Sequence, residues 1–79
     1  MSRVPYADST GVLTAEVELN YASDVFLVDS NNFRKYQSGQ SFTYYGGHYT
    51  NSPVRITVNG SGRWYLIVRG SGQYRYRFY

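Results

Sequence analysis

Apolar and polar residues alternate along most of this chain, and this alternation constrains its fold more than any other feature. Between positions 12 and 19 almost every second residue is apolar, and the residues between them are polar or acidic. Successive side chains of a strand point to opposite faces, so this period of two predicts a half-buried strand. The segments 54–58, 63–69 and 73–79 show the same period. The residues expected in the core are Leu13, Val17, Leu19, Phe26, Val28, Val54, Ile56, Val58, Trp64, Leu66, Val68, Tyr74, Tyr76 and Phe78.

Two segments outside this alternation predict a short central strand and a helical turn. The apolar run 25–28 lies between two aspartates and is too short for a helix, which favours a strand covered on both faces. Residues 30–32 are typical of a helix N-terminus, and Gly39 is typical of a helix end. The sequence therefore predicts at most one short helical turn near 31–37.

Glycines mark the expected ends of the remaining strands. A strand over 41–45 is expected to stop at Gly46 and Gly47, and the segments 59–62 and 70–72 predict tight turns. About six short strands separated by such turns are typical of an antiparallel β-sandwich. The predicted fold class is all-β, a small antiparallel sandwich of jelly-roll or Greek-key type.

Length and composition limit what such a fold can carry. A chain of 79 residues predicts a single domain over 1–79, in which folding buries about 60% of the unfolded surface. The chain has no cysteine, which excludes disulfides, thiolate zinc sites and a cysteine nucleophile. No segment approaches the roughly 18 apolar residues that a membrane helix needs, so the expected location is the cytoplasm, with no membrane partner.

Charge is polarised along the sequence. All five acidic residues lie in the first 29 positions, whereas positions 30–79 carry seven of the eight cations and no acidic side chain. The net charge of +3 is therefore the sum of an acidic N-terminal part and a strongly basic remainder. A concentrated positive field attracts anions, which favours an anionic small molecule or a nucleic acid as partner.

A hairpin around the turn at 70–72 would gather much of this positive charge on one face. If Arg69 pairs with Gln73, then Tyr65 lies opposite Arg77 and Arg63 lies opposite Tyr79. Guanidinium groups bind phosphate and aromatic rings stack on bases, so such a face could bind a phosphate-bearing ligand. The alternative is structural: Tyr65 and Arg77 would form a cation–π pair, and Glu16 or Glu18 would neutralise Arg75 or Arg55 across strands. The candidate ligand-binding residues are Arg55, Arg63, Tyr65, Arg69, Arg75, Arg77 and Tyr79.

Catalytic groups are scarce. His48 is the only histidine and lies in an expected loop, far in sequence from every carboxylate. Glu16 and Glu18 share one face of a strand, which is typical of a solvated surface rather than of a pair of catalytic acids. No metal site, cofactor or catalytic residue is predicted, and the chain is not expected to be an enzyme.

Several short motifs together resemble a known bacterial family. They are Val28-Asp29-Ser30-Asn31-Asn32-Phe33, Tyr44-Tyr45-Gly46-Gly47, Ser52-Pro53-Val54-Arg55, and Ser61-Gly62 followed by Trp64. In this spacing they resemble the family catalogued as domain of unknown function 1883, over about residues 25–79. The resemblance implies a small β-sandwich that occurs alone or ahead of TIR domains, the signalling modules of immunity, and it implies no activity.

Two functions remain open on these observations. The first is a non-catalytic binding module that recognises a nucleotide signal or nucleic acid on the arginine- and tyrosine-rich face, with a possible link to TIR-type bacterial immunity. The alternative is a module for protein–protein interaction or self-assembly with no small-molecule ligand, since tyrosine and arginine are also enriched at protein interfaces. Exposed strand edges favour a homo-oligomer in either case.

Overall fold

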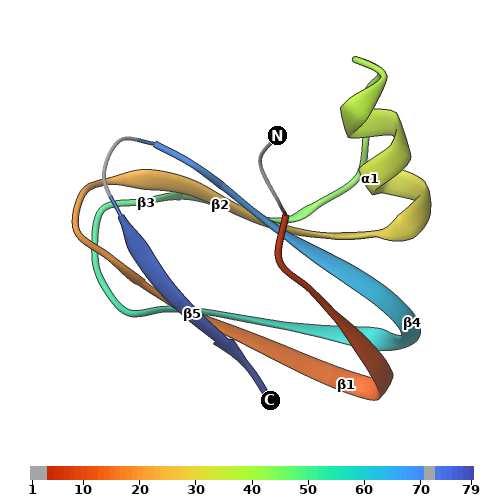
Figure 1. The fold of residues 1–79 in the computed structure, drawn as a ribbon, viewed down its shortest axis with the longest axis horizontal. Helices are drawn as coiled ribbons and strands as arrows, with labels where there is room; N and C mark the ends of the chain where they lie inside the picture. Colours follow the sequence, from red (N-terminus) through yellow and green to blue (C-terminus); the bar gives the residue numbers. More distant parts are fainter. Residues whose placement is uncertain (1–3, 71–72) are drawn as a thin grey trace.

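The computed structural model describes residues 4–70 and 73–79, in which one five-stranded antiparallel sheet is accompanied by one short helix (Figure 1). The strands follow the order β3-β2-β4-β1-β5 across the sheet. The predicted all-β class and the single short helix are confirmed. The elements are β1 (Tyr6–Leu19), β2 (Ser23–Asp29), α1 (Ser30–Gln37), β3 (Tyr45–Tyr49), β4 (Val54–Arg69) and β5 (Tyr74–Phe78).

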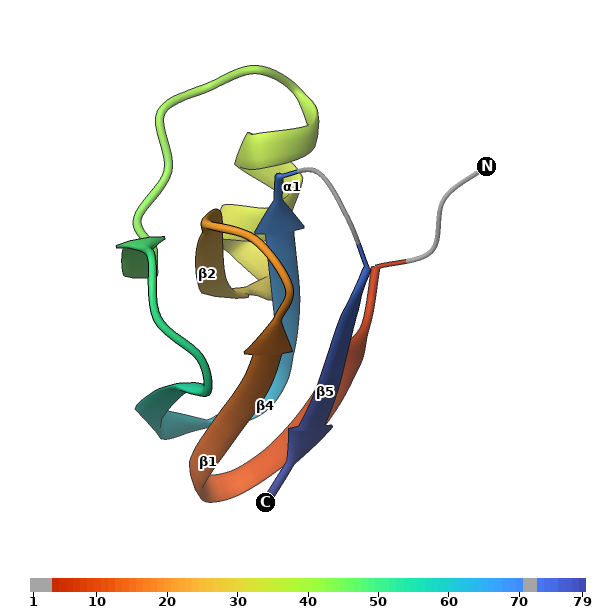
Figure 2. The same cartoon turned by 90° about the vertical axis from the view of Figure 1, so that its left-hand side faces the viewer.

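Two long strands, β1 and β4, form the centre of the sheet and bend together. They pair without interruption from Tyr6 opposite Tyr65 to Val17 opposite Val54. Both bend sharply at one corner of the molecule, and the sheet curves back over itself as a result (Figures 1 and 2). In β4 the bend coincides with Gly60 and Gly62, whose φ angles of +140° and +120° are unfavourable for other residues.

The predicted turn at 59–62 is therefore wrong. These residues belong to the continuous strand β4, and the glycines allow it to bend while its hydrogen bonds to β1 are kept. Strand β1 likewise begins at Tyr6 rather than near position 12. Residues 6–11 lack apolar alternation, but pairing with β4 needs only their backbone groups.

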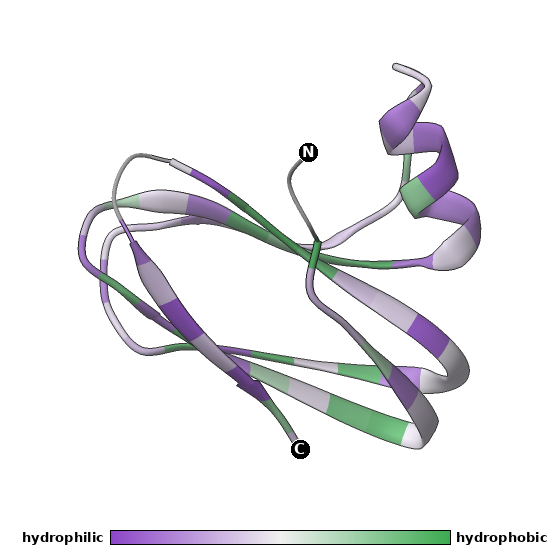
Figure 3. Ribbon diagram, in the orientation of Figure 1, coloured by the Kyte–Doolittle hydropathy of each residue, from purple (hydrophilic) through white to green (hydrophobic). Residues whose placement is uncertain are grey.

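The main core lies between the two halves of the bent sheet. Alternate residues of β1, β2 and β4 point into it, and Figure 3 shows hydrophobic and hydrophilic positions alternating along the strands. Val25 and Leu27 are fully buried there, so it is these residues and not Phe26 and Val28 that face the main core. The expected burial of Val28 is nevertheless confirmed, on the other face of β2. Tyr76 points to the same side, but 48% of it remains exposed because β5 lies at the sheet edge. The buried core residues are Leu13, Ala15, Val17, Val25, Leu27, Val54, Ile56, Val58, Trp64 and Leu66.

A second apolar layer covers the outer face of β2 and β4. Val28 is completely buried there, and Ile67 is 5% exposed. Helix α1 packs on this face, where the ring of Phe33 stacks on Tyr65 at 4.0 Å between centroids. The prediction that 25–28 is covered on both faces is confirmed. Ile67 points away from the main core, as predicted, but it is buried in this second layer.

Helix α1 begins at a cap that the sequence suggested only in part. The backbone N–H of Asn32 donates to Asp29 Oδ1 at 2.9 Å, so Asp29 is the N-cap residue. After the helix Gly39 adopts a φ of +78°, as expected for a residue that ends a helix. No helix in the described part of the chain is long and apolar enough to cross a membrane.

Strand β3 starts where the sequence predicted a strand to end. Gly46 and Gly47 lie inside β3, and the expected strand over 41–45 is wrong. Gly46 pairs with Phe26 and approaches the backbone of Val25 so closely that no side chain would fit. The expected turn at 70–72 lies partly outside the described residues, because residues 71 and 72 are not among them.

Candidate binding edge at strand β5

Strand β5 pairs with β1 and not with β4. Both sides of β4 are already occupied, by β1 and β2, so no edge of β4 is left for β5. The predicted hairpin between 63–69 and 73–79 is therefore wrong, and Tyr65 does not lie opposite Arg77. The pairs that form are Ala15–Phe78, Glu16–Arg77, Val17–Tyr76, Glu18–Arg75 and Leu19–Tyr74.

This topology separates the seven candidate residues into three places. Arg63 and Tyr65 lie beyond the bend of β4, and Arg69 lies opposite Asp24 at the far end of that strand. The single arginine- and tyrosine-rich face that the sequence predicted does not form. The other four candidates gather around two glutamates of β1 on a surface that we call the β5 face: Arg55, Arg75, Arg77 and Tyr79, with Glu16 and Glu18.

Glu16 connects two arginines on the β5 face. Its Oε2 accepts from Arg55 Nη2 at 2.9 Å, and its Oε1 accepts from Nε of Arg77. Only 11% of the glutamate side chain is exposed, which makes this one carboxylate a cross-strand bridge between β4, β1 and β5. The hydrogen bond from Arg77 lowers the pKa of Glu16 below its ordinary value, and burial opposes this effect without cancelling it. The same hydrogen bond raises the pKa of Arg77.

The lowered pKa of Glu16 predicts a pH-dependent stability. A carboxylate with a depressed folded-state pKa contributes stability above its unfolded-state pKa, and this contribution is lost as the pH falls through the folded-state pKa. The urea midpoint of the parent should therefore fall toward that of Glu16→Gln as the pH is lowered from 6 through about 4.5 and below. Glu18→Gln, which removes a carboxylate without an ion pair, is the control. A gap between parent and Glu16→Gln that stays constant with pH would contradict the assignment.

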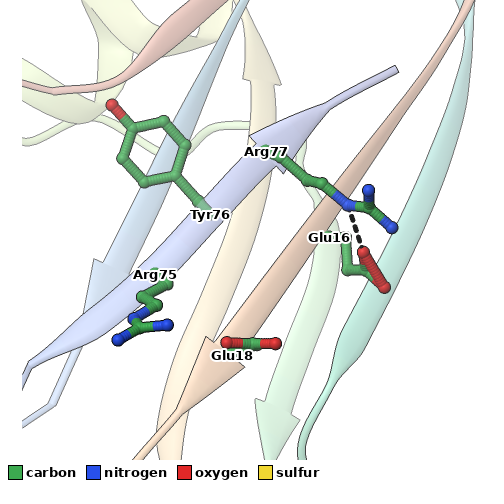
Figure 4. A pocket seen from close by; sticks show the side chains of 5 residues that line it. All are labelled: Glu16, Glu18, Arg75, Tyr76 and Arg77. Atoms are coloured by element: carbon green, nitrogen blue, oxygen red, sulfur yellow. Dashed lines mark hydrogen bonds and ion pairs between the residues drawn. The ribbon is translucent and has the colours of Figure 1, made fainter.

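Among the described residues, Arg75 is the arginine of the β5 face that makes no ion pair. It lies opposite Glu18, yet neither side chain has an oppositely charged partner within salt-bridge distance in the described part of the chain. Figure 4 shows that Arg75 and Arg77 project from one face of β5, the face that carries Glu16 and Glu18, and that Tyr76 projects from the opposite face. The depression between these side chains has a volume of about 200 Å³. Small-molecule sites usually measure about 300–1,000 Å³, so this one is small for such a ligand.

The outer side of β5 carries unpaired backbone groups. Tyr79 and Thr14 exchange two backbone hydrogen bonds, of 2.7 and 2.9 Å. In an antiparallel ladder such pairs recur at every second residue, so Arg77 and Arg75 bond to β1 in the same way. The N–H and C=O groups of the residues that alternate with these three point to the opposite edge of β5, and no strand of the described chain lies on that edge. These residues are Tyr74, Tyr76 and Phe78.

Aromatic side chains flank this free edge on both faces of β5. Tyr74, Tyr76 and Phe78 follow one another at centroid distances of 6.1 and 5.7 Å on the core side. On the opposite side the guanidinium of Arg77 lies 5.1 Å from the ring centre of Tyr79, in a cation–π contact. Tyr76 is 48% exposed and Tyr79 is 57% exposed, so both rings can contact a partner.

Arg63 and Tyr65 have structural partners. Arg63 Nε donates to Asp8 Oδ1 at 3.0 Å, and its guanidinium lies 4.3 Å from the ring centre of Tyr6. The hydrogen bond to Asp8 raises the pKa of Arg63. Tyr65 lies between Tyr6 and Phe33 of helix α1. The predicted cation–π pair of Tyr65 with Arg77 is therefore wrong, because Arg77 lies over Tyr79 and Tyr65 packs against aromatic rings. Arg63 and Tyr65 instead have structural partners, among them Tyr6 and Asp8, that the sequence did not reveal.

His48 has a carboxylate partner that sequence distance concealed. It lies opposite Asp24 in the pairing of β2 with β3, and its Nδ1 is 2.8 Å from Asp24 Oδ1. Both side chains are well exposed. Among the described residues no group of three or more histidine, aspartate or glutamate side chains is placed to hold a metal ion.

Comparison with protein families gives a match over most of the chain. Residues 9–76 match the model of the family described as Domain of unknown function (DUF1883). The chain belongs to this family. The match begins at residue 9, within β1, whereas the resemblance noted from sequence began only near residue 25. The DUF1883 match therefore includes most of β1, the strand that pairs with β5. Searches of curated proteins and of solved structures give no match.

Two features of the β5 face were not predicted from sequence. The pairing of Glu16 with Arg55 was among the sequence alternatives and is confirmed, but its bridge to Arg77 depends on the pairing of β1 with both β4 and β5, which joins residues far apart in the chain. The unpaired groups of Tyr74, Tyr76 and Phe78 depend on β5 lying at the edge. The alternation of arginine and aromatic residues over 74–78 was the available signal, since charged residues are common on edge strands.

Proposed function

We propose that this member of the DUF1883 family is a non-catalytic protein-interaction module that receives an extended polypeptide at the free edge of β5. The observation that carries the proposal is the set of unpaired backbone groups on Tyr74, Tyr76 and Phe78. An extended peptide can add a strand to such an edge and obtain its affinity from main-chain hydrogen bonds. A cytoplasmic role beside TIR-type immune signalling, which the family resemblance implies, is part of this proposal.

Side chains around the edge support this function. Tyrosine and arginine are enriched at the energetic centres of protein interfaces, and exposed Tyr76 and Tyr79 stand beside Arg75 and Arg77. The small depression on the β5 face also suits the side chain of a peptide better than a whole nucleotide.

A phosphate-bearing ligand is the second candidate, and Arg75 is the observation that favours it. Its guanidinium is free of carboxylate partners in the described part of the chain and could bind a phosphate. Three of the five candidate arginines, however, already pair with carboxylates: Arg55, Arg63 and Arg77. This pairing reduces the positive charge available to an anion, which is why the polypeptide ranks first.

Selection of peptides from a random display library tests the proposed function. The counter-selection uses Tyr76→Pro, because proline at this position removes an edge donor without removing a hydrogen bond to β1. Tyr76→Ala is the matched control, because it removes the same ring and keeps the backbone N–H. We expect the affinity of selected peptides for Tyr76→Pro to be at least about tenfold lower than for Tyr76→Ala, which corresponds to the loss of roughly one hydrogen bond.

The outcomes of this selection are distinct. No enriched peptide, or peptides that bind Tyr76→Pro as well as the parent, would overturn the edge as a docking site. Thermal-shift titration with nucleotides and short oligonucleotides examines the second candidate in parallel, since ligand at a hundred times its Kd adds about 2.7 kcal/mol of stability. A shift that disappears in Arg75→Gln would favour the phosphate-bearing ligand instead.

A further inference from the structure

The strand already paired with β5 shows which side chains β5 accepts. Segment 15–19 of β1 has the sequence Ala-Glu-Val-Glu-Leu. Its two glutamates lie opposite Arg77 and Arg75, and its three apolar residues lie opposite the aromatic residues of β5. Directly opposed residues of two strands project on the same face of the sheet. A strand on the other side of β5 would meet the same alternation of arginine and aromatic side chains.

Positive charge is left over on β5 for such a second strand. Glu16 divides its two oxygens between Arg55 and Arg77, and Arg75 makes no ion pair among the described residues. The side chain of Arg77 is 70% exposed despite its contact with Glu16. Carboxylates arriving at the free edge would therefore find two arginines within reach, one of them without any carboxylate partner.

A second copy of β5 does not suit this edge. Arginine occupies every second position of β5, so the antiparallel register that pairs the whole of β5 with a second copy places Arg75 opposite Arg77 on both sides of Tyr76. Like charges directly opposed across strands are destabilising. A strand that alternates glutamate or aspartate with apolar residues replaces this repulsion with attraction.

We propose that the free edge of β5 binds an acidic strand from another protein, antiparallel, with a carboxylate at every second residue and apolar residues between. The carboxylates lie opposite Arg75 and Arg77, and the apolar side chains pack beside Tyr74, Tyr76 and Phe78. This inference rests on the proposed function and adds the chemistry of the partner to it. The alternating carboxylates give register, because a slip of one residue would turn them toward the aromatic side.

A peptide copied from β1 tests the proposal directly. The probe is the capped, fluorescently labelled peptide of residues 13–20, Leu-Thr-Ala-Glu-Val-Glu-Leu-Asn, and its control carries glutamine at both glutamate positions. We expect the parent to bind the acidic peptide about tenfold more tightly than the control at low salt, and the difference to shrink as salt screens the charges. Arg75→Gln should remove most of this preference. Arg34→Gln, which removes an equal charge on exposed helix α1, should leave it unchanged.

Amide hydrogen exchange shows whether the peptide occupies the free edge. Docking there protects the N–H groups of Tyr74, Tyr76 and Phe78, whereas replacement of the protein's own β1 by the peptide leaves them unprotected. Protection at these three residues that is lost with the glutamine peptide would support the proposal. Occupation of the position of β1, or unchanged binding by Arg75→Gln, would overturn it.

Failure here differs from failure of the proposed function. If library peptides that lack alternating carboxylates protect the same three amides, the edge is a docking site and the acidic strand is wrong. If no peptide protects them, both proposals fall. A dimer in light scattering that dissociates in Tyr76→Pro would assign the edge to a second copy and overturn the acidic partner.

Discussion

Replacing Trp64 by alanine is expected to lower the free energy of unfolding by about 3–5 kcal/mol, the usual cost of removing a large buried aromatic side chain. Trp64 is 6% exposed and lies in the core directly after the bend of β4. Its Nε1 donates to the carbonyl of Gly60 at 3.2 Å, and its ring meets that of Tyr45 edge to face. The substitution removes core packing and the contact that fixes the bend.

Urea denaturation followed by circular dichroism measures this effect. A domain of this size is stable by only about 4–12 kcal/mol, so the variant should lose at least about a quarter of its stability and unfold at a clearly lower urea concentration. Val12→Ala is the matched control, because Val12 is 63% exposed on the neighbouring strand. A cooperative transition near the parent midpoint in Trp64→Ala would show that the indole is not part of the core.

Gly46→Ala is expected to destabilise the fold by at least about 2 kcal/mol, through backbone strain together with a steric clash. Gly46 has a φ of +137°, and a Cβ atom there would lie 2.0 Å from the carbonyl oxygen of Val25. That oxygen belongs to the backbone of the neighbouring strand, so β3 would have to move away from β2. Ile56 of the core, 3.2 Å from the same point, limits any such movement.

The adjacent glycine is the natural control for this substitution. Gly47 has ordinary backbone angles, and a Cβ atom there would meet nothing within 4 Å. Gly47→Ala should therefore change stability by less than about 1 kcal/mol. Equal urea midpoints for the two variants would contradict the close approach of β3 to β2.

Period two in the sequence predicted the inward faces of β1 and β4 correctly. Leu13, Val17 and Trp64 lie where alternation placed them, because a face of a strand is a local property that its own residues specify. The short run 25–28 gave no alternation to follow, so the choice between its two faces was wrong by one residue. Helix α1 directly follows β2 in the chain and could pack on either face of it, so the sequence did not show which face the helix covers.

The candidate site was predicted less well than the core, and topology is the reason. Glycines at 60 and 62 were interpreted as a turn because local sequence cannot distinguish a reversal from a bend with pairing retained. That interpretation divided β4 into two strands and made its second half the expected partner of β5. In the structure both edges of β4 are paired with other strands, so β5 pairs with β1. Arg55, Arg75 and Arg77 were among the predicted binding residues, but their position around the glutamates of β1 depends on long-range pairing that the sequence did not reveal.

The continuous pairing of β1 with β4 also has a consequence for how the chain reaches its folded state. β1, near the start of the chain, pairs along its length with β4 and on its other side with β5, so almost none of the central sheet can form from neighbouring segments. Closing such long loops costs entropy before any pairing compensates it, and chains of this kind fold in milliseconds to seconds rather than microseconds. Until residues 74–78 arrive, the acidic segment of β1 is itself an unpaired edge. Pairing with β5 covers that apolar and acidic edge and leaves in its place an edge that carries two arginines, whose charges oppose pairing between copies of the chain.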